Sequence, residues 1–136
     1  MALLFAPKIG TIVTVDFDQG FRAPEMVKCR LAVVISPPIK EWGKLVTVIP
    51  LSTTAPLPAM PYHCQVDIPF RLPPYWGNRL RWAKGDMVNA VGFHRVDLLL
   101  LGKDVNGRRQ YQMATLSDEM LRRLHSCVLH SLGLLP

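Results

Sequence analysis

RLAVVIS, residues 30–36, is the stretch of the sequence that decides the fold. It is nearly continuous in β-branched and other apolar side chains, which is typical of a central strand that is covered on both faces. Pro37 and Pro38 follow directly and end the strand, because proline has no N–H to donate to a sheet. We therefore predict a buried strand that begins with a charged residue, Arg30.

Three more strands are predicted around it. GTIVTVDFD (10–18) and HCQVDIPF (63–70) alternate apolar with polar residues, which is the period of a half-buried strand. Pro69 indicates that the second of these lies at a sheet edge or ends early. KLVTVIPLS (44–52) is a β-branched, apolar strand that ends in hydroxyl-bearing residues.

Glycine residues mark bends and turns in the second half of the chain. LRWAKGDMVNAVGFHRVD (80–97) is predicted to form one long bent strand or two short ones, because Gly85 and Gly92 mark a bulge or bend. Asn106-Gly107 is a strong hairpin signal, so the segments near 98–101 and 111–114 are expected to pair. Two stretches without a period are predicted loops: 19–28, and 71–79 with exposed aromatic and basic groups.

From residue 117 the period changes to that of a helix. Ser117 can cap the N-terminus, acidic residues follow in the first turn, and Gly133 lies at the far end. We expect a helix of roughly four turns. Its apolar residues recur at helical spacing: Leu116, Met120, Leu124, Val128 and Leu132.

An order of strands first and one helix last, with little alternation, favours a mainly β fold. We predict an antiparallel, partly open barrel with a C-terminal helix packed on it, and an α/β sandwich is the weaker alternative. The length of 136 residues with 49% hydrophobic residues suits one domain, expected over residues 1–136.

The charge balance indicates a class of partner. Sixteen Lys and Arg against ten Asp and Glu give a formal net charge of +6, which on so small a chain favours a polyanion. The basic residues are scattered, so any phosphate site must be assembled by folding. The start, MALLFAPKIG, has no basic leader and no apolar run is long enough to span a bilayer, so we expect a cytoplasmic protein without a membrane partner.

Cysteine and histidine spacing gives no metal or cofactor motif. Cys29, Cys64 and Cys127 are odd in number, far apart and without a CxxC pair, so we interpret them as small buried hydrophobic residues. His125 and His130 are five apart, off the i, i+4 zinc spacing. Motifs of nucleotide hydrolases, dinucleotide enzymes, zinc proteases and α/β-hydrolases are absent, and we expect no metal and no cofactor.

Polar residues that interrupt apolar strands are the best candidates for function. Such residues destabilise a buried strand unless their polar groups are hydrogen-bonded or line a cleft. Arg30 begins the most buried strand, Ser52 and Thr53 end the next, and Lys84-Gly85-Asp86 interrupts a later one. In a curled sheet these strand ends can converge on one groove, with the groups that a phosphodiester needs.

Such a groove could cleave RNA without a metal. The 2′-OH must lose a proton, the phosphorane must be held by cations or N–H donors, and the 5′-oxygen must regain a proton. Arg30 offers a planar fork to two phosphate oxygens, with Thr53 and Ser52 beside it. Asp86 could then accept or orient the proton beside Lys84. The competing interpretation is structural, with an exposed Asp86–Lys84 pair and an Arg30 that lies along a strand end.

Further contacts with a nucleic acid are expected from histidine and aromatic side chains. His63 and His94 lie on predicted strands, although each histidine is more often structural. Four aromatic side chains could stack on unpaired bases: Tyr62, Tyr75, Trp76 and Trp82. Core packing explains Trp82 at least as well.

The same residues carry a resemblance to the PemK/MazF family of toxin ribonucleases from bacterial toxin–antitoxin pairs. That family has a first strand G-x-[IV]-x-x-[VA]-[DN], a loop with a Glu, an R-P-V-[LV]-V strand, a strand ending in P-[VCL]-[ST]-[ST], and a strand with Arg or Lys and an Asp. This chain has GTIVTVDFD, Glu25 five residues before Arg30, RLAVVIS, PLST and KGD, in that order. Leu31 replaces the usual Pro, and Lys84 stands where some members have Arg.

The resemblance implies an SH3-like, CcdB-type barrel and a homodimer. It also implies metal-independent cleavage of single-stranded RNA to a 2′,3′-cyclic phosphate, and neutralisation by a cognate antitoxin. Catalysis would fall to Arg30, Thr53, Asp86 and Lys84. Contacts with the substrate are then expected from Ser52, Glu25, His63, Arg81 and Trp82.

Two other functions stay open on the sequence. The same barrel serves CcdB-like toxins that bind DNA gyrase and need no catalytic groups. A non-catalytic nucleic-acid-binding barrel would bind RNA with a strong salt dependence. The nuclease hypothesis explains the positions of Arg30, Thr53 and Asp86, which the other two leave as coincidence.

Overall fold

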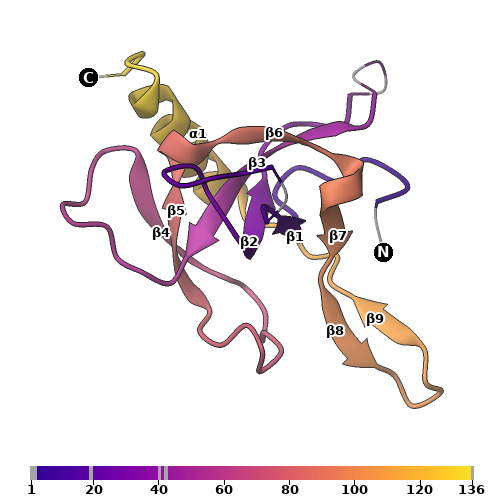
Figure 1. Ribbon diagram of the computed structural model, residues 1–136. Helices are drawn as coiled ribbons and strands as arrows, with labels where there is room; N and C mark the ends of the chain where they lie inside the picture. The colour runs from indigo at the N-terminus through magenta and orange to yellow at the C-terminus, as the bar shows by residue number, and fades with distance from the viewer. Residues whose placement is uncertain (1–2, 19, 40, 42, 136) are drawn as a thin grey trace.

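The computed structural model describes residues 3–18, 20–39, 41 and 43–135. Residues 1–2 and 136 at the ends of the predicted domain, and Gln19 at the start of a predicted loop, lie outside the described residues. Within the described chain, strands come first and one helix comes last, as predicted (Figure 1).

The elements are short. Helix α1 spans Asp118–Ser131, and two 3-10 turns, η2 (Gly85–Met87) and η3 (Phe93–Arg95), follow β5 and β6. The strands are β1 (Ile12–Asp16), β2 (Cys29–Val34), β3 (Leu45–Ser52), β4 (His63–Asp67), β5 (Leu80–Lys84), β6 (Asn89–Gly92), β7 (Val96–Leu98), β8 (Leu100–Lys103) and β9 (Arg109–Tyr111).

Seven strands form one open antiparallel sheet, which confirms the predicted architecture. The order is β4-β5-β3-β2-β1-β7, and β6 also pairs with β3. β3 changes partner along one edge, because residues 45–48 pair with β6 whereas Leu51 and Ser52 pair with β5. The turn η2 connects those two partners and lies where β3 passes from one to the other.

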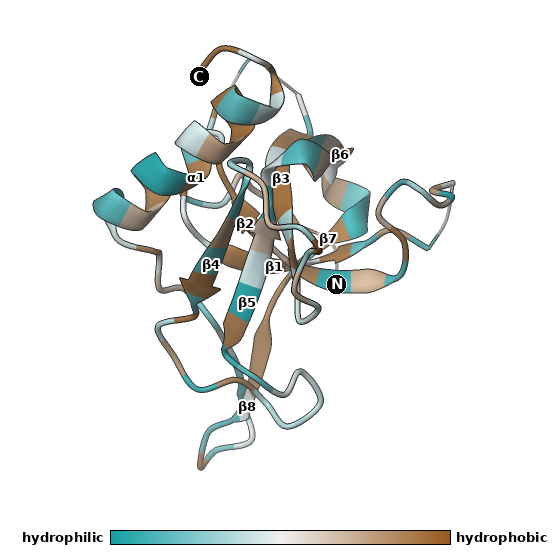
Figure 2. Ribbon diagram, turned by 90° about the vertical axis from the view of Figure 1, so that its left-hand side faces the viewer, coloured by the Kyte–Doolittle hydropathy of each residue, from teal (hydrophilic) through white to brown (hydrophobic). Residues whose placement is uncertain are grey.

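The sheet has a core on each face. The face that α1 covers buries Ile12, Leu31, Val33, Ile49, Leu51, Cys64, Val66 and Ala83 with Leu124 and Cys127 of the helix. The opposite face buries Val13, Val15, Ala32, Val34, Val46, Val48 and Val91, closed by Phe17 and Met26. Figure 2 shows the result as alternating hydrophobic and hydrophilic colour along β4 and β5.

Helix α1 begins where the sequence predicts. The Oγ of Ser117 accepts a hydrogen bond from the Met120 N–H at 3.2 Å, which caps the first turn. Gly133 follows the helix with a φ of 73°, a conformation that favours glycine. The helix packs on β4 and η2. No helix in the described part of the chain is long and apolar enough to cross a membrane.

Residues 80–97 differ from the expectation of one or two strands. They form three strands, because the chain turns at both predicted glycines: Gly85 opens η2, and Gly92 precedes η3. His94 therefore lies in η3 and not on a strand. The β8–β9 hairpin is confirmed, but its ladder runs from Leu100 opposite Tyr111 to Lys103 opposite Arg109, closer to the turn than predicted.

The interpretation of the cysteines as buried is right for two of them. Cys64 and Cys127 are buried, whereas Cys29 is exposed. Cys29 is the first residue of β2 and opposes Asp16 at the end of β1, so it lies at the rim of the sheet. The apolar run that buries the rest of β2 starts two residues later.

We predict that Leu124→Ala lowers the free energy of unfolding by about 2–5 kcal/mol, because Leu124 is fully buried between α1 and the sheet. Leu129→Ala on the same helix is the control, since Leu129 is exposed, and it should change stability by about 0.5 kcal/mol or less. Urea denaturation of both variants measures this. Equal effects would contradict the docking of α1 described here.

Candidate active site at the strand ends

Arg30 is held in place by the backbone just before β2. Its Nε donates to the carbonyl oxygen of Val27 at 2.9 Å, and the side chain is half-buried. This bond fixes the plane of the guanidinium through Nε. The fork of terminal nitrogens is then the part of the side chain that can meet a ligand.

The strand register brings Arg30 to the level of Ser52. Ala32 of β2 lies opposite Pro50 of β3, and two residues further the same register reaches Arg30 and Ser52. Ser52 in turn pairs with Trp82 of β5. Because side chains alternate between the faces of a sheet, these residues lie on the face opposite α1.

The two hydroxyls at the end of β3 are placed differently. Ser52 is 4% exposed, and its Oγ accepts a hydrogen bond from the Thr54 N–H at 3.1 Å. It therefore shapes the turn, as serine commonly does at a strand end. Thr53 is exposed in the bend that follows.

His63 lies near both charged residues of the KGD stretch. Lys84 is its register partner across β4 and β5, and its Nε2 lies 3.7 Å from Oδ1 of Asp86. Its Nδ1 accepts a hydrogen bond from the Met60 N–H at 3.1 Å. The proton of the neutral ring is therefore on Nε2, toward Asp86. The sequence suggests a direct pair of Asp86 with Lys84, whereas the ion pair that the structure shows for Asp86 is with His63.

Asp86 also lines a cleft with Glu25. The cleft has a volume of about 450 Å³. One wall comes from the loop before β2, which Met26 anchors in the core, and the other from η2 and the start of β6. The residues that line it are Pro24, Glu25, Met26, Asp86, Met87, Val88 and Asn89. Two carboxylates thus share a cleft beside the strand ends.

Arg81 is built into the fold. It is 5% exposed, and its guanidinium donates to the carbonyl oxygens of Asn78, at 2.8 Å, and Trp76. Burial, and after it the positive charge of Arg30, lowers the pKa of Arg81. These bonds hold the loop 71–79 to β5, so a contact of Arg81 with substrate stays a prediction.

The remaining predicted groups are spread around this region. Trp82 is half-buried in β5, and Tyr75 is 84% exposed at the tip of the loop. Trp76 packs against the core under α1. Sequence reasoning could not find the carbonyl of Val27 or the N–H of Met60, because any residue type supplies these backbone groups. Among the described residues, no group of three or more His, Cys, Asp or Glu could hold a metal ion.

Comparison with known families gives one match over nearly the whole chain. The model of the PemK-like, MazF-like toxins of type II toxin–antitoxin systems matches residues 8–132. None of the curated proteins matches the chain by sequence.

Solved structures share the fold at low identity. MazF (Form-I) from Deinococcus radiodurans has a TM-score of 0.63 and 19% identity, covering 95% of this chain and 98% of its own. An endoribonuclease from a mycobacterial species, in complex with its cognate antitoxin, has a TM-score of 0.58 and 14% identity, covering 96% and 98%. The Mycobacterium tuberculosis toxin MazF-mt6 has a TM-score of 0.57 and 14% identity, covering 90% and 97%.

We predict that Arg81→Ala lowers the free energy of unfolding by about 1–3 kcal/mol, because two backbone carbonyls lose their donors in a buried place. Arg79→Ala is the matched control. Arg79 is 52% exposed and meets Asp67 at 3.5 Å, and such a surface pair contributes about 1 kcal/mol or less. Chemical denaturation compares the two, and equal losses would contradict the structural role of Arg81.

Proposed function

Because the chain belongs to the PemK-like, MazF-like toxins of type II toxin–antitoxin systems, we propose that it is a metal-independent endoribonuclease that cleaves single-stranded RNA. The observation that supports this best is the arrangement on one sheet face. Arg30, Ser52 and Trp82 lie beside one another on β2, β3 and β5, and Lys84 and His63 lie opposite each other two residues further along β5. A phosphate held beside Arg30 and Ser52 would have proton donors and acceptors close by, at Lys84 and His63.

Arg30 would hold the scissile phosphate. Its Nε is already bonded to Val27, so its terminal nitrogens donate to the two non-bridging oxygens. The hydroxyl of Thr53 donates to one of the same oxygens. Ser52 keeps its O–H as a donor while its Oγ accepts from Thr54. These donors stabilise the charge that gathers on the oxygens in the phosphorane.

Asp86 and Lys84 would assist proton transfer from the 2′-OH and to the leaving 5′-oxygen. The 2′-oxygen attacks phosphorus, a 2′,3′-cyclic phosphate forms, and the bond to the 5′-oxygen breaks. Asp86 accepts or orients the proton of the 2′-OH, and Lys84 stabilises or protonates the leaving 5′-oxygen. His63 contacts Asp86 at 3.7 Å and keeps it in position.

The other expected contacts surround this centre. Glu25 faces Asp86 across the cleft of about 450 Å³ and can bond a ribose hydroxyl or a base edge. Trp82 offers a ring for stacking at the same level as Ser52. Arg81 adds positive charge from the far side of β5.

We extend the proposal to the partners of the enzyme. A similar structure was solved with its cognate antitoxin, and the net charge of +6 suits an acidic protein segment as well as RNA. A cognate antitoxin, a homodimer and a cytoplasmic location are therefore part of the proposal. The cleavage sequence would depend on the loops that surround the site.

The test is cleavage of a long unstructured RNA in EDTA by the purified protein. We expect discrete cuts that leave a 2′,3′-cyclic phosphate and a 5′-OH. Arg30→Ala should lower the rate by about 100-fold or more, because it removes the donors to the phosphate. Arg108→Ala, at the tip of the β8–β9 hairpin, is the control and should keep the rate within about twofold.

Two results would contradict the nuclease. Intact RNA with a protein that is folded by circular dichroism, and trapped DNA gyrase that does not depend on Arg30, would favour the gyrase-binding function. RNA binding that weakens steeply with salt and produces no new chain ends would favour the plain binding function.

A further inference from the structure

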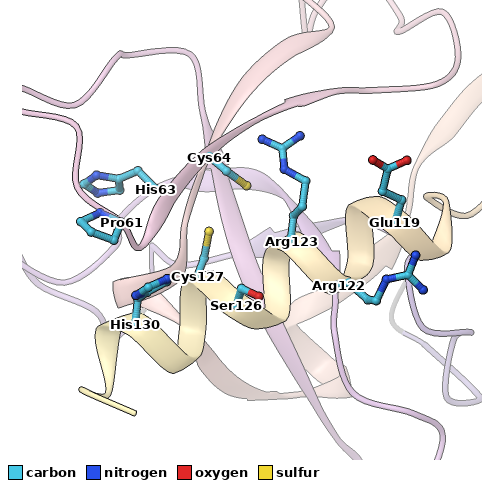
Figure 3. Close-up of a pocket in the computed structure, with 9 residues that line it drawn as sticks. All are labelled: Pro61, His63, Cys64, Glu119, Arg122, Arg123, Ser126, Cys127 and His130. Carbon is cyan, nitrogen blue, oxygen red and sulfur yellow. The ribbon is translucent and has the colours of Figure 1, made fainter. Parts of the chain in front are cut away.

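Two buried cysteines meet directly under the KGD stretch. Cys64 lies on β4 and Cys127 on α1, and both side chains are buried and line the same pocket. Figure 3 shows the two sulfur atoms between the strand and the helix, next to a pocket of about 400 Å³. The pocket is lined by Cys64, Cys127 and Arg123 among other residues. A small oxidant can thus reach a thiol pair that is otherwise inside the fold.

The surroundings activate one thiol of the pair. A hydrogen bond from Cys127 and, to a smaller extent, the positive charge of Arg123 lower the pKa of Cys64 to about 7, against burial, which raises it. The same hydrogen bond and burial raise the pKa of Cys127. Cys64 is therefore the nucleophile, since the thiolate is the reactive form, and Cys127 is its neighbour.

The exposed cysteine has the opposite environment. Partial burial, followed by the negative charges of Asp16, Asp18 and Asp97, raises the pKa of Cys29. The most accessible thiol of the chain is thus the less reactive one at neutral pH. This contrast provides an internal control.

We propose that Cys64 and Cys127 form a peroxide-sensitive modification site, in which oxidation joins them as a disulfide between β4 and α1. The Cys64 thiolate attacks one oxygen of hydrogen peroxide, hydroxide leaves and takes up a proton, and a sulfenic acid remains. The Cys127 sulfur then attacks the Cys64 sulfur, a second water leaves, and the S–S bond forms. One peroxide is reduced to two waters while two thiols are oxidised.

A disulfide here would disturb the KGD stretch. Gly85 lies against Cys127 so closely that a Cβ on it would be 2.8 Å from the Cys127 Cβ and 2.8 Å from the carbonyl oxygen of Tyr62. The Gly85 N–H also donates to that oxygen at 2.9 Å. Since a disulfide draws its two sulfurs to about 2.05 Å, any movement of Cys127 is passed to Gly85 and so to Lys84 and Asp86. Oxidation should therefore lower cleavage, a consequence that rests on the proposed function.

The first test is chemical and needs no RNA. The reduced full-length protein is treated with hydrogen peroxide in native buffer, alkylated and digested without reductant. We expect a Cys64–Cys127 cross-linked peptide that has lost two hydrogen atoms and that dithiothreitol reverses, with Cys29 still alkylated. Cys29→Ser should behave like the unchanged protein. Cys127→Ser, whose hydroxyl can still donate to Cys64, should stop at a Cys64 sulfenic acid that dimedone traps, and Cys64→Ala should give neither product.

Oxidation of Cys29 first, or dimers linked through Cys29 without the Cys64–Cys127 peptide, would overturn the proposal. Circular dichroism of the reduced variants shows that they are folded before peroxide is added. A folded Cys127→Ser that forms no trappable sulfenic acid would also overturn it, because Cys64 would then not be the nucleophile.

The second test measures RNA cleavage before and after oxidation. We expect a loss of about tenfold or more, since small displacements of catalytic groups are costly, and recovery with dithiothreitol. Cys127→Ser, which cannot form the disulfide, should keep its rate in peroxide. A disulfide that forms without a change in rate would overturn the coupling to the site. A disulfide in a protein that never cleaves RNA would uphold the thiol pair and contradict the proposed function alone.

Discussion

The exchange of partners along one edge of β3 is the constraint on which the rest of the structure depends. Residues 45–48 pair with β6 and residues 51–52 pair with β5, so the chain between β5 and β6 must turn within the few residues between them. It does so at η2, where Gly85 is enclosed by Tyr62 and Cys127 and has no room for a side chain. This turn places Lys84 and Asp86 at the edge of the sheet face that also carries Arg30 and Ser52.

The charges of the region follow from the same geometry. Arg30 on β2 and Arg81 on β5 are separated by β3, and the positive charge of Arg30 contributes to the lowered pKa of Arg81. Such repulsion costs stability, and the backbone carbonyls of Val27, Asn78 and Trp76 offset part of it. The terminal nitrogens of Arg30 are available to an anion, whereas the guanidinium of Arg81 is bonded to backbone carbonyls. A phosphate in the proposed reaction would therefore bind at Arg30, with Arg81 adding positive charge nearby.

The sequence predicted well what local patterns determine. The period of residues 10–18, the apolar run of residues 30–36 and the capped helix after Ser117 all became the expected elements, because each depends on burial or on hydrogen bonds to nearby residues. The turns at Gly85 and Gly92 were recognised as breaks, but not as 3-10 turns, since the exchange of partners on β3 is a tertiary feature. The exposure of Cys29 was missed for the same reason, because the rim of a sheet depends on the neighbouring strand.

The site was predicted as a set of residues and not as an arrangement. Arg30, Ser52, Thr53 and Lys84 could be chosen because polar side chains in apolar strands must be hydrogen-bonded or line a cleft. The family resemblance supported that choice. The contact of His63 with Asp86 and the bonds of Arg81 to its own loop could not be found, because they join residues whose spacing has no period. The Cys64–Cys127 pair was hidden in the same way, being 63 positions apart in the sequence and adjacent in space.

The most direct measurement is a titration of the isotope-labelled protein with an RNA whose ribose 2′-OH groups are replaced by hydrogen, so that it binds without being cut. The account predicts that the largest amide shifts in the NMR spectrum fall on Arg30, Thr53, Lys84 and Asp86, on the sheet face opposite α1. Shifts confined to α1 or to the β8–β9 hairpin would contradict it.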